Sequence, residues 1–192
     1  GEREAADFRQ QVAIKLLRGC SGQDPDTARL RRERRLLARL EHPHIARLVD
    51  GGELEDGTPF VAMEYVEGET LLRHARGRDL GIAGRLRLFE QLLEAVAYAH
   101  RHLIVHRDIK PENVLVDTDG QLKLLDFGIA KLLDDVDAQG SGATQTVAGA
   151  MTPCYASPEQ LQGREVSTQT DIYSLGVVLY ELLTGQLPFP PD

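Results

Sequence analysis

The sequence predicts an α+β chain of two lobes: a small β-rich lobe with one main helix, and a larger lobe that is mainly helical. Three strand patterns and one helical pattern lie within residues 1–66, whereas amphipathic helical patterns dominate residues 67–192. The composition changes within residues 64–68, and we place the boundary between the lobes there. With 192 residues, 42% of them hydrophobic, the chain is long enough to bury a core.

Three strands are predicted in the first lobe because β-branched and aromatic residues are concentrated in short runs. These runs lie at residues 11–17, 46–53 and 60–66, and the last two are joined by the turn Glu55-Asp56-Gly57-Thr58. The three runs predict a small sheet.

One helix is predicted between the first and second of these strands. Asp24 can serve as its N-cap with Pro25 at the first helical position, and the helix would run to about Leu40. At 100° per residue, Glu33 shares a face with Leu30, Leu36, Leu37 and Leu40. A buried carboxylate is costly without a cation or hydrogen-bond donors, so Glu33 requires a partner from elsewhere in the fold.

The second lobe is predicted to contain several helices and two short strands. The helices lie at residues 71–76, at about 85–102 and near the end of the chain, and the strands at 114–116 and 122–124. Residues 134–150 are rich in Gly, Ala and small polar residues and have no hydrophobic period, which is typical of a mobile loop.

Charge and cysteine content exclude several classes of function. The net charge of −8 argues against a global nucleic-acid-binding surface, and the arginines of the predicted helix at 24–40 are better explained as a solvated face than as a local patch. Cys20 and Cys154 fit neither a disulfide framework nor a paired-thiolate metal site, so we expect a reducing, cytoplasmic setting. The apolar run at 172–183 is too short to span a bilayer, so we expect no membrane segment within this chain.

Three motifs together carry the prediction of chemistry. Phosphoryl transfer requires metal-binding oxygen ligands, a cation on the phosphates and a group that orients the attacking hydroxyl. In chain order, the sequence has V-A-I-K ending at Lys15, H-R-D-I-K-P-E-N from His106 to Asn113, and D-F-G beginning at Asp126. Each string alone would be a weak signal, and Asp108, Lys15 or Asp126 taken singly is better explained as a turn or surface residue. In this order and spacing they resemble the eukaryotic-type serine/threonine protein kinases, and most closely the bacterial members.

The resemblance covers essentially the whole chain and implies a bilobal protein-kinase fold that uses ATP and magnesium. Met63-Glu64-Tyr65-Val66 resembles the hinge between the lobes, and Ser157-Pro158-Glu159 resembles the A-P-E element of kinases. Lys110, together with Thr152 before the S-P-E string, resembles the serine/threonine-specific branch, so the expected substrates are proteins with Ser or Thr hydroxyls.

Carried over to this sequence, the resemblance implies a role for each matching residue. Lys15 would hold the α- and β-phosphates and pair with Glu33, while Asp108 would orient the substrate hydroxyl and Lys110 would steady the γ-phosphate. Asn113 and Asp126 would hold magnesium. The remaining expected nucleotide contacts come from the hinge residue Met63, from backbone groups of Glu64 and Val66, and from Ala13 and Leu115 on the two faces of adenine.

Four other matching residues are expected to brace loops rather than to touch the reactants: His106, Phe127, Glu159 and Asp171. Ser141, Thr144 and Thr146 in the predicted loop are candidate phosphorylation sites that could pair with Arg107, although an unmodified loop is almost equally favoured.

The chain departs from the family pattern at both ends. No G-x-G-x-x-G precedes Lys15, so we expect weaker ATP binding and little activity from this chain alone. The sequence stops before the last helices of the family pattern, so both lobes are expected to be incomplete and Glu159 to lack its usual partner. The alternative is a pseudokinase that serves as a binding or scaffolding module. The retained Lys15, Asp108, Asn113 and Asp126 favour an active parent kinase.

Overall fold

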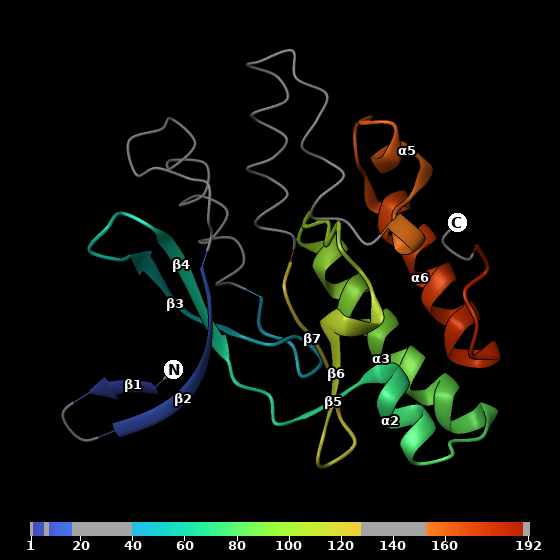
Figure 1. Cartoon of the computed structure of the whole chain (residues 1–192), viewed down its shortest axis with the longest axis horizontal. Helices are drawn as coiled ribbons and strands as arrows, with labels where there is room; N and C mark the ends of the chain where they lie inside the picture. Colours follow the sequence, from blue (N-terminus) through green and yellow to red (C-terminus); the bar gives the residue numbers. More distant parts are fainter. Residues whose placement is uncertain (1, 6–7, 17–39, 128–152, 190–192) are drawn as a thin grey trace.

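Two antiparallel sheets and a group of helices make up the described part of the chain (Figure 1). The computed structural model describes residues 2–5, 8–16, 40–127 and 153–189, and its side-chain environments cover 11–16, 40–127 and 154–189. The predicted helix at 24–40, with Glu33, and the predicted loop at 134–150 therefore lie outside the described residues, apart from Leu40. No described helix is long and apolar enough to cross a membrane.

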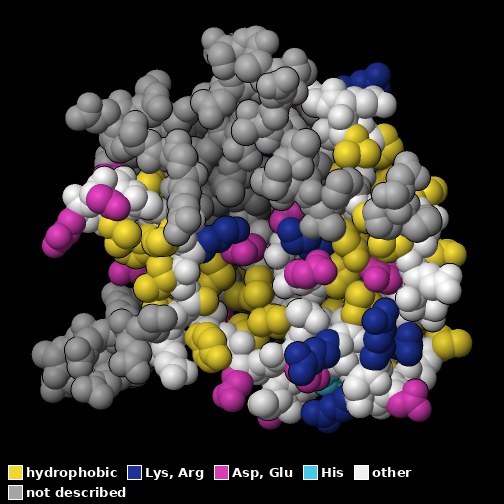
Figure 2. Space-filling view, in the orientation of Figure 1, with side chains coloured by type: hydrophobic (Ala, Val, Ile, Leu, Met, Phe, Trp, Pro, Cys, Tyr) yellow, Lys and Arg dark blue, Asp and Glu magenta, His cyan; other side chains and the backbone are white. Residues whose placement is uncertain are grey.

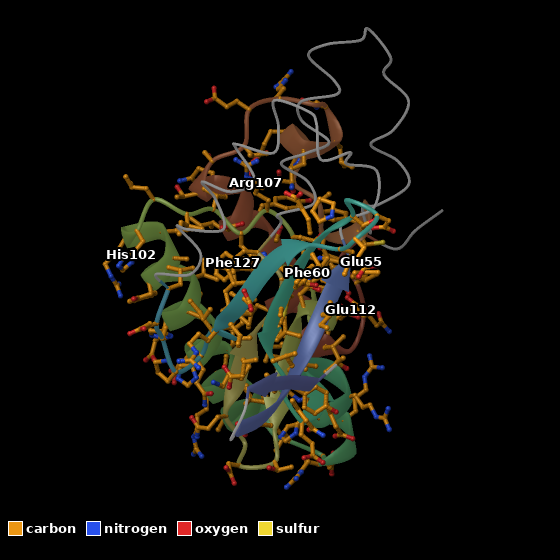
Figure 3. All side chains as sticks on the ribbon, turned by 90° about the vertical axis from the view of Figure 1, so that its left-hand side faces the viewer. Glu55, Phe60, His102, Arg107, Glu112 and Phe127 are labelled. Carbon is orange, nitrogen blue, oxygen red and sulfur yellow. The ribbon has the colours of Figure 1, made fainter. Side chains whose placement is uncertain are left out.

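The larger sheet contains four strands in the order β1-β2-β4-β3. Their bounds are β1 Glu2–Ala5, β2 Phe8–Leu16, β3 Leu48–Glu53 and β4 Pro59–Glu64. Strand β4 lies between β2 and β3, and its apolar residues are buried, with Val61 fully inaccessible. Figure 3 looks onto this sheet, with Glu55 at the turn between β3 and β4 and Phe60 on β4. Strand β1 was not predicted, because its four residues, Glu-Arg-Glu-Ala, carry no β-branched or aromatic signal.

The smaller sheet has the order β5-β6-β7, formed by β5 Gly68–Thr70, β6 Val114–Asp117 and β7 Leu122–Leu124. The sequence predicted β6 and β7 but not β5, which is only three residues long. A Cβ at Gly68 would lie 2.3 Å from the carbonyl oxygen of Val116, so only glycine allows β5 to approach β6 this closely. The pairing of β5 with β6, just before α2 begins, therefore depends on Gly68.

The helices pack around α3 Ile82–Arg101 and α6 Thr168–Thr184, with α2 Leu71–Gly77 and α5 Pro158–Leu161 beside them. Leu92 of α3 and Val178 and Leu182 of α6 are fully buried, so each helix turns an apolar face toward the core. Helix α6 begins at a capping box formed by Ser167 and Thr170 and ends at Gly185 in the left-handed conformation. The α+β class and its division into a sheet part and a helical part are confirmed.

The segment just before β3 also ties the sheet part to the helical part. The backbone N–H of Leu124 on β7 donates to the His44 carbonyl, and the Ala46 N–H donates to the Leu124 carbonyl, both at 2.9 Å. The ring of His42 packs on Tyr98 of α3 at 4.9 Å. The two backbone hydrogen bonds place the segment before β3 against β7, the strand that leads to Asp126.

Candidate active site

Asp108, Lys110 and Asn113 come together at the start of η1, the short helix Pro111–Asn113. The Lys110 Nζ lies 3.1 Å from Asp108 Oδ2, and the Asn113 Nδ2 donates to the same oxygen at 3.0 Å and to the Asp108 carbonyl at 2.7 Å. A cation and an amide therefore fix the orientation of the Asp108 carboxylate. The sequence placed these residues on one loop, and the structure shows that they contact one another.

Asp126 follows β7 and meets Lys15, which comes from β2 of the other sheet. The Lys15 Nζ lies 3.0 Å from Asp126 Oδ2, and both side chains are about a third exposed. Asp126 has a φ of 51°, an uncommon conformation for a residue other than glycine and one that often occurs at functional sites. In Figure 2, basic and acidic side chains gather at the centre of the displayed face, with hydrophobic surface around them. The ion pair between Lys15 and Asp126 joins the two parts of the chain.

Asp171 at the start of α6 holds the loop that carries Asp108. Its fully buried carboxylate accepts backbone N–H groups of His106 and Arg107, each at 2.8 Å, and His100 Nε2 lies 2.7 Å away. Arg107 has a φ of 67°, so this anchor stabilises a strained backbone conformation next to Asp108. The expected bracing role of Asp171 is confirmed, and the contribution of His100 is an addition that its sequence context did not reveal.

His106 is fully buried and contacts the D-F-G segment and the residue before it. Its Nε2 lies 2.8 Å from the Leu125 carbonyl, and its Nδ1 accepts the Asp108 N–H at 3.3 Å. These contacts fit a neutral ring with the proton on Nε2, because a carbonyl can only accept and a backbone N–H can only donate. Burial lowers the pKa of His106 despite the nearby charge of Asp171. The ring also packs on Phe127 at 4.7 Å, which confirms the bracing contact expected of both residues.

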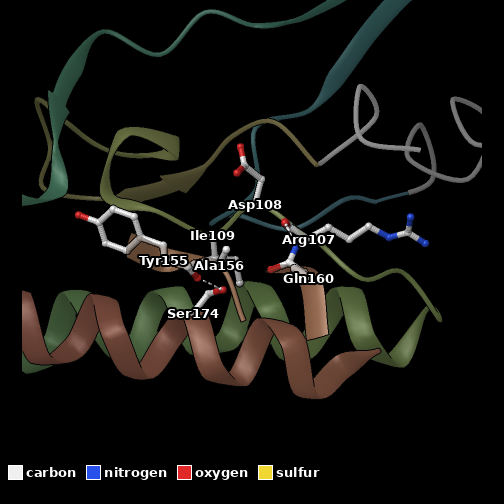
Figure 4. A pocket seen from close by; sticks show the side chains of 7 residues that line it. All are labelled: Arg107, Asp108, Ile109, Tyr155, Ala156, Gln160 and Ser174. Atoms are coloured by element: carbon white, nitrogen blue, oxygen red, sulfur yellow. Dashed lines mark hydrogen bonds between the residues drawn. The ribbon is translucent and has the colours of Figure 1, made fainter. Parts of the chain in front are cut away.

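The segment from η2 (Pro153–Tyr155) to α5 lies against the other side of the loop. The Gln160 Nε2 donates to the Arg107 carbonyl at 2.7 Å, and the Ser174 Oγ of α6 donates to the Tyr155 carbonyl at 2.8 Å. These residues, with Asp108, Ile109 and Ala156, line a small pocket (Figure 4). In that view, the Asp108 carboxylate points away from Ser174 and α6. The pocket is therefore part of the support for the loop.

Tyr155 and Glu181 form a buried pair within this support. The Tyr155 hydroxyl donates to Glu181 Oε2 at 2.5 Å. Burial, followed by the neighbouring Glu181 carboxylate, raises the pKa of Tyr155 well above its usual value. The hydroxyl thus stays protonated and supplies the hydrogen bond that the buried carboxylate needs.

Glu159 of the S-P-E string finds a partner within the described residues. Its Oε1 accepts the Thr170 hydroxyl at 2.7 Å, and this hydrogen bond lowers the pKa of Glu159. Thr170 in turn accepts the Ser167 N–H at 3.3 Å, so Glu159 is joined to the N-terminal cap of α6. This contact supports a bracing role, with Thr170 as a partner that the sequence did not identify.

The residues expected at adenine come from both sheets and from the connection between them. Ala13 on β2 pairs with Met63 on β4 in the larger sheet, while Leu115 lies on β6 of the smaller sheet. Glu64 ends β4, and Val66 follows in the connection to β5. Ala13, Glu64, Val66 and Leu115 are half-buried, whereas Met63 is buried. Glu33 lies outside the described residues, as do Ser141, Thr144 and Thr146.

The donor set at Asn113 and Asp126 fits a hard divalent cation. The Asn113 amide nitrogen is engaged with Asp108, which leaves Oδ1 as the atom able to bind a cation. A carboxylate and an amide oxygen suit magnesium, which prefers oxygen ligands and keeps several waters. In the described part of the chain, no group of three or more His, Cys, Asp or Glu residues could hold a metal by itself. A cation held by these two oxygens would have its remaining coordination positions open to water or to phosphate oxygens.

Comparisons with known proteins identify the family. Residues 4–192 match the family model described as the protein kinase domain. The chain is 45% identical to a probable serine/threonine-protein kinase of Streptomyces coelicolor and 43% identical to serine/threonine-protein kinase PrkC of Bacillus subtilis, over 95% and 94% of its length. It spans only 28% and 27% of those relatives.

Two solved structures have the same fold. The kinase domain of Mycobacterium tuberculosis PknI aligns with the whole chain and with 72% of its own chain, at a TM-score of 0.73 and 30% identity. Rad53 in complex with AMP-PNP aligns with 94% of the chain and 43% of its own, at a TM-score of 0.71 and 29% identity. With the matched domain model and the bacterial relatives, these structures place the chain in the protein kinase family, as a serine/threonine-kinase-like domain.

Proposed function

We propose that the protein containing this chain transfers the γ-phosphate of ATP to Ser or Thr hydroxyls of other proteins. The observation that carries the proposal is the ion pair between Lys15 and Asp126, which brings a cation of one sheet to the D-F-G carboxylate. Phosphoryl transfer depends on such a gathering of charges around the phosphates. The relatives are named serine/threonine-protein kinases, and the Rad53 structure contains a nucleotide analogue.

Asp108 is proposed to receive or orient the proton of the attacking hydroxyl. As the hydroxyl oxygen forms its bond to the γ-phosphorus, the bond from that phosphorus to the bridging oxygen of ADP breaks, and the proton passes toward Asp108. Lys110 touches the Asp108 carboxylate and so lies where it can stabilise charge on the transferred group. Asn113 keeps the carboxylate oriented through its amide hydrogen bonds.

Lys15, Asn113 and Asp126 are proposed to hold the triphosphate. Lys15 would contact the α- and β-phosphates, with Glu33 as its second partner, and the oxygens of Asn113 and Asp126 would hold Mg²⁺. The metal neutralises phosphate charge when bound. The adenine would lie between Ala13 and Leu115, near Met63, and meet backbone groups of Glu64 and Val66. Residues 1–66 would then form the N-lobe part with the hinge, and residues 67–192 the C-lobe part.

The proposal is tested with the full-length protein and its Asp108→Asn variant. Transfer of labelled phosphate from ATP to the protein itself and to Ser-, Thr- and Tyr-containing peptides is measured, together with ADP binding. We expect labelling of Ser and Thr, and a loss of at least about 100-fold in Asp108→Asn with nucleotide binding retained. Asp117→Asn is the control, because Asp117 is the half-exposed last residue of β6, at the turn to β7, and has no proposed role in the reaction.

Nucleotide binding by the wild-type protein without any transfer would contradict the enzyme proposal and favour the scaffolding alternative. Labelling of Tyr alone would contradict the proposed acceptor class.

A further inference from the structure

The side chain of Glu64 connects three segments around the proposed adenine site. Its Oε1 lies 2.9 Å from Lys123 Nζ of β7, and its Oε2 accepts the Arg47 N–H at 3.2 Å. The Glu64 N–H in turn donates to the Arg47 carbonyl at 2.8 Å. The carboxylate thus joins the end of β4 both to the segment before β3 and to the smaller sheet.

Lys123 lies on the same face of the smaller sheet as the proposed adenine contact Leu115. The two residues are cross-strand partners, whereas their neighbours Val114, Val116, Leu122 and Leu124 are fully buried on the opposite face. Side chains alternate between the two faces of a strand, so Lys123 points away from that core, on the side where its ammonium reaches Glu64. The ion pair therefore connects the face of the smaller sheet that carries Leu115 to Glu64 at the end of β4.

We infer that Lys123 is a positioning residue for nucleotide binding, acting through Glu64, and this inference rests on the proposed function. The Lys123–Glu64 pair sets the distance between Leu115, the apolar floor of the proposed adenine site, and the backbone groups of Glu64 and Val66 at its polar edge. Because adenine must both stack on the floor and hydrogen-bond to the edge, this distance determines how well the two contacts can be made together.

The partial burial of the pair indicates that it can hold this geometry. The Lys123 and Glu64 side chains are 18% and 34% exposed, so water competes with the pair less than with an ion pair on the open surface. Without Lys123, the Glu64 carboxylate would keep only the Arg47 N–H among the contacts described above. Neither charge belongs to the groups proposed to touch the phosphates, so ATP and ADP should be affected equally.

The test compares the full-length wild-type protein with Lys123→Met and Lys123→Arg. ADP affinity is measured by calorimetry, and kcat and KM for ATP are measured in the transfer assay. We expect Lys123→Met to raise both the Kd for ADP and the KM for ATP about fivefold, with kcat at saturating ATP unchanged within about twofold. Lys123→Arg keeps the cation and should recover most of the affinity.

Arg73→Met is the matched control. Arg73 forms an ion pair with Glu69 at 3.4 Å, but its side chain is 79% exposed, and we expect no change in the Kd for ADP. Thermal unfolding of each variant separates a loss of folded protein from a loss of affinity. If Lys123→Met unfolds, Lys123→Arg and Glu64→Gln supply the affinity comparison, and Glu64→Gln should weaken ADP binding while Lys123→Arg should not.

An unchanged Kd in a folded Lys123→Met variant would overturn the inference and leave the proposed kinase function intact. A fall in kcat with constant KM would also overturn it, because the residue would then act on the transfer step. If the wild-type protein bound no nucleotide, both the inference and the proposed function would fail.

Discussion

Asp108 and Lys15 are held at the candidate site in different ways. The loop of Asp108 is anchored by the fully buried Asp171, by the ring of His106 and by Gln160. Lys15 instead lies on β2 next to Ile14, which is 48% exposed, and its ammonium is held by the partly exposed pair with Asp126. The loop therefore keeps its geometry through buried polar contacts, whereas the position of Lys15 depends on the pairing of β2 with β4 and on one partly exposed ion pair. Substitutions at the anchors of the loop should consequently reduce mainly stability, whereas substitution of Lys15 should reduce mainly activity.

The largest effect is expected from Asp171→Ala. The change removes the acceptor of two backbone N–H groups in a buried site, and we expect the free energy of unfolding to fall by about 3–5 kcal/mol. Asp117→Ala is the matched control, because Asp117 also accepts two backbone N–H groups but lies in a half-exposed turn, where we expect about 1 kcal/mol. Urea denaturation measures both, and equal losses would contradict the contrast between buried and exposed support.

Lys15→Met should separate activity from stability. We expect kcat to fall by about 100-fold or more, because a cation on the phosphates is lost, while the free energy of unfolding changes by less than about 1 kcal/mol. Kinetics and urea denaturation of the same preparation measure the two quantities. Arg87→Met on the exposed side of α3 is the control and should change neither. A stability loss as large as that of Asp171→Ala would show that β2 is as firmly held as the loop.

Tyr155→Phe tests the outer support of the loop. The variant removes the hydrogen bond to the buried Glu181, and we expect a loss of about 2 kcal/mol in the free energy of unfolding. Tyr180→Phe is the control, because Tyr180 lies on α6 next to Glu181 and its side chain is exposed. Stability measured by denaturation should be unchanged in the control, and a comparable loss there would assign the effect to the helix rather than to the pair.

The smallest effect is expected from pH. The pKa values of His106 and His42 are lowered by burial from the ordinary value of 6.5, so the unfolded chain binds their protons more tightly than the folded chain does. The stability contribution of both rings is present above about pH 6.5 and is lost as the pH falls further. Denaturation between pH 7.5 and pH 5.5 should show this decrease.

His106→Phe should reduce the slope of stability against pH more than His42→Phe, because His106 is fully buried and His42 is only half-buried. A steeper acid loss in His106→Phe would show that the fully buried ring is not the main source of the effect.

Much of the fold could be predicted because its elements are long or strongly patterned. Helix α3 was predicted at about 85–102 and lies at Ile82–Arg101, and strand β7 was predicted without error. Strands β1 and β5 were missed, since four and three residues carry too little periodicity. Gly68 would have been the only local signal of β5, and its meaning depends on how closely Val116 approaches it.

By itself, the sequence determined the class of the protein and the residues able to carry its chemistry, because the V-A-I-K, H-R-D and D-F-G strings, each weak alone, occur together in a fixed order and spacing. Only the tertiary structure decided which groups contact one another. The pairs Lys15–Asp126, His100–Asp171 and Glu64–Lys123 join residues far apart along the chain. Such contacts depend on how sheets and helices pack, and local periodicity contains no information about them.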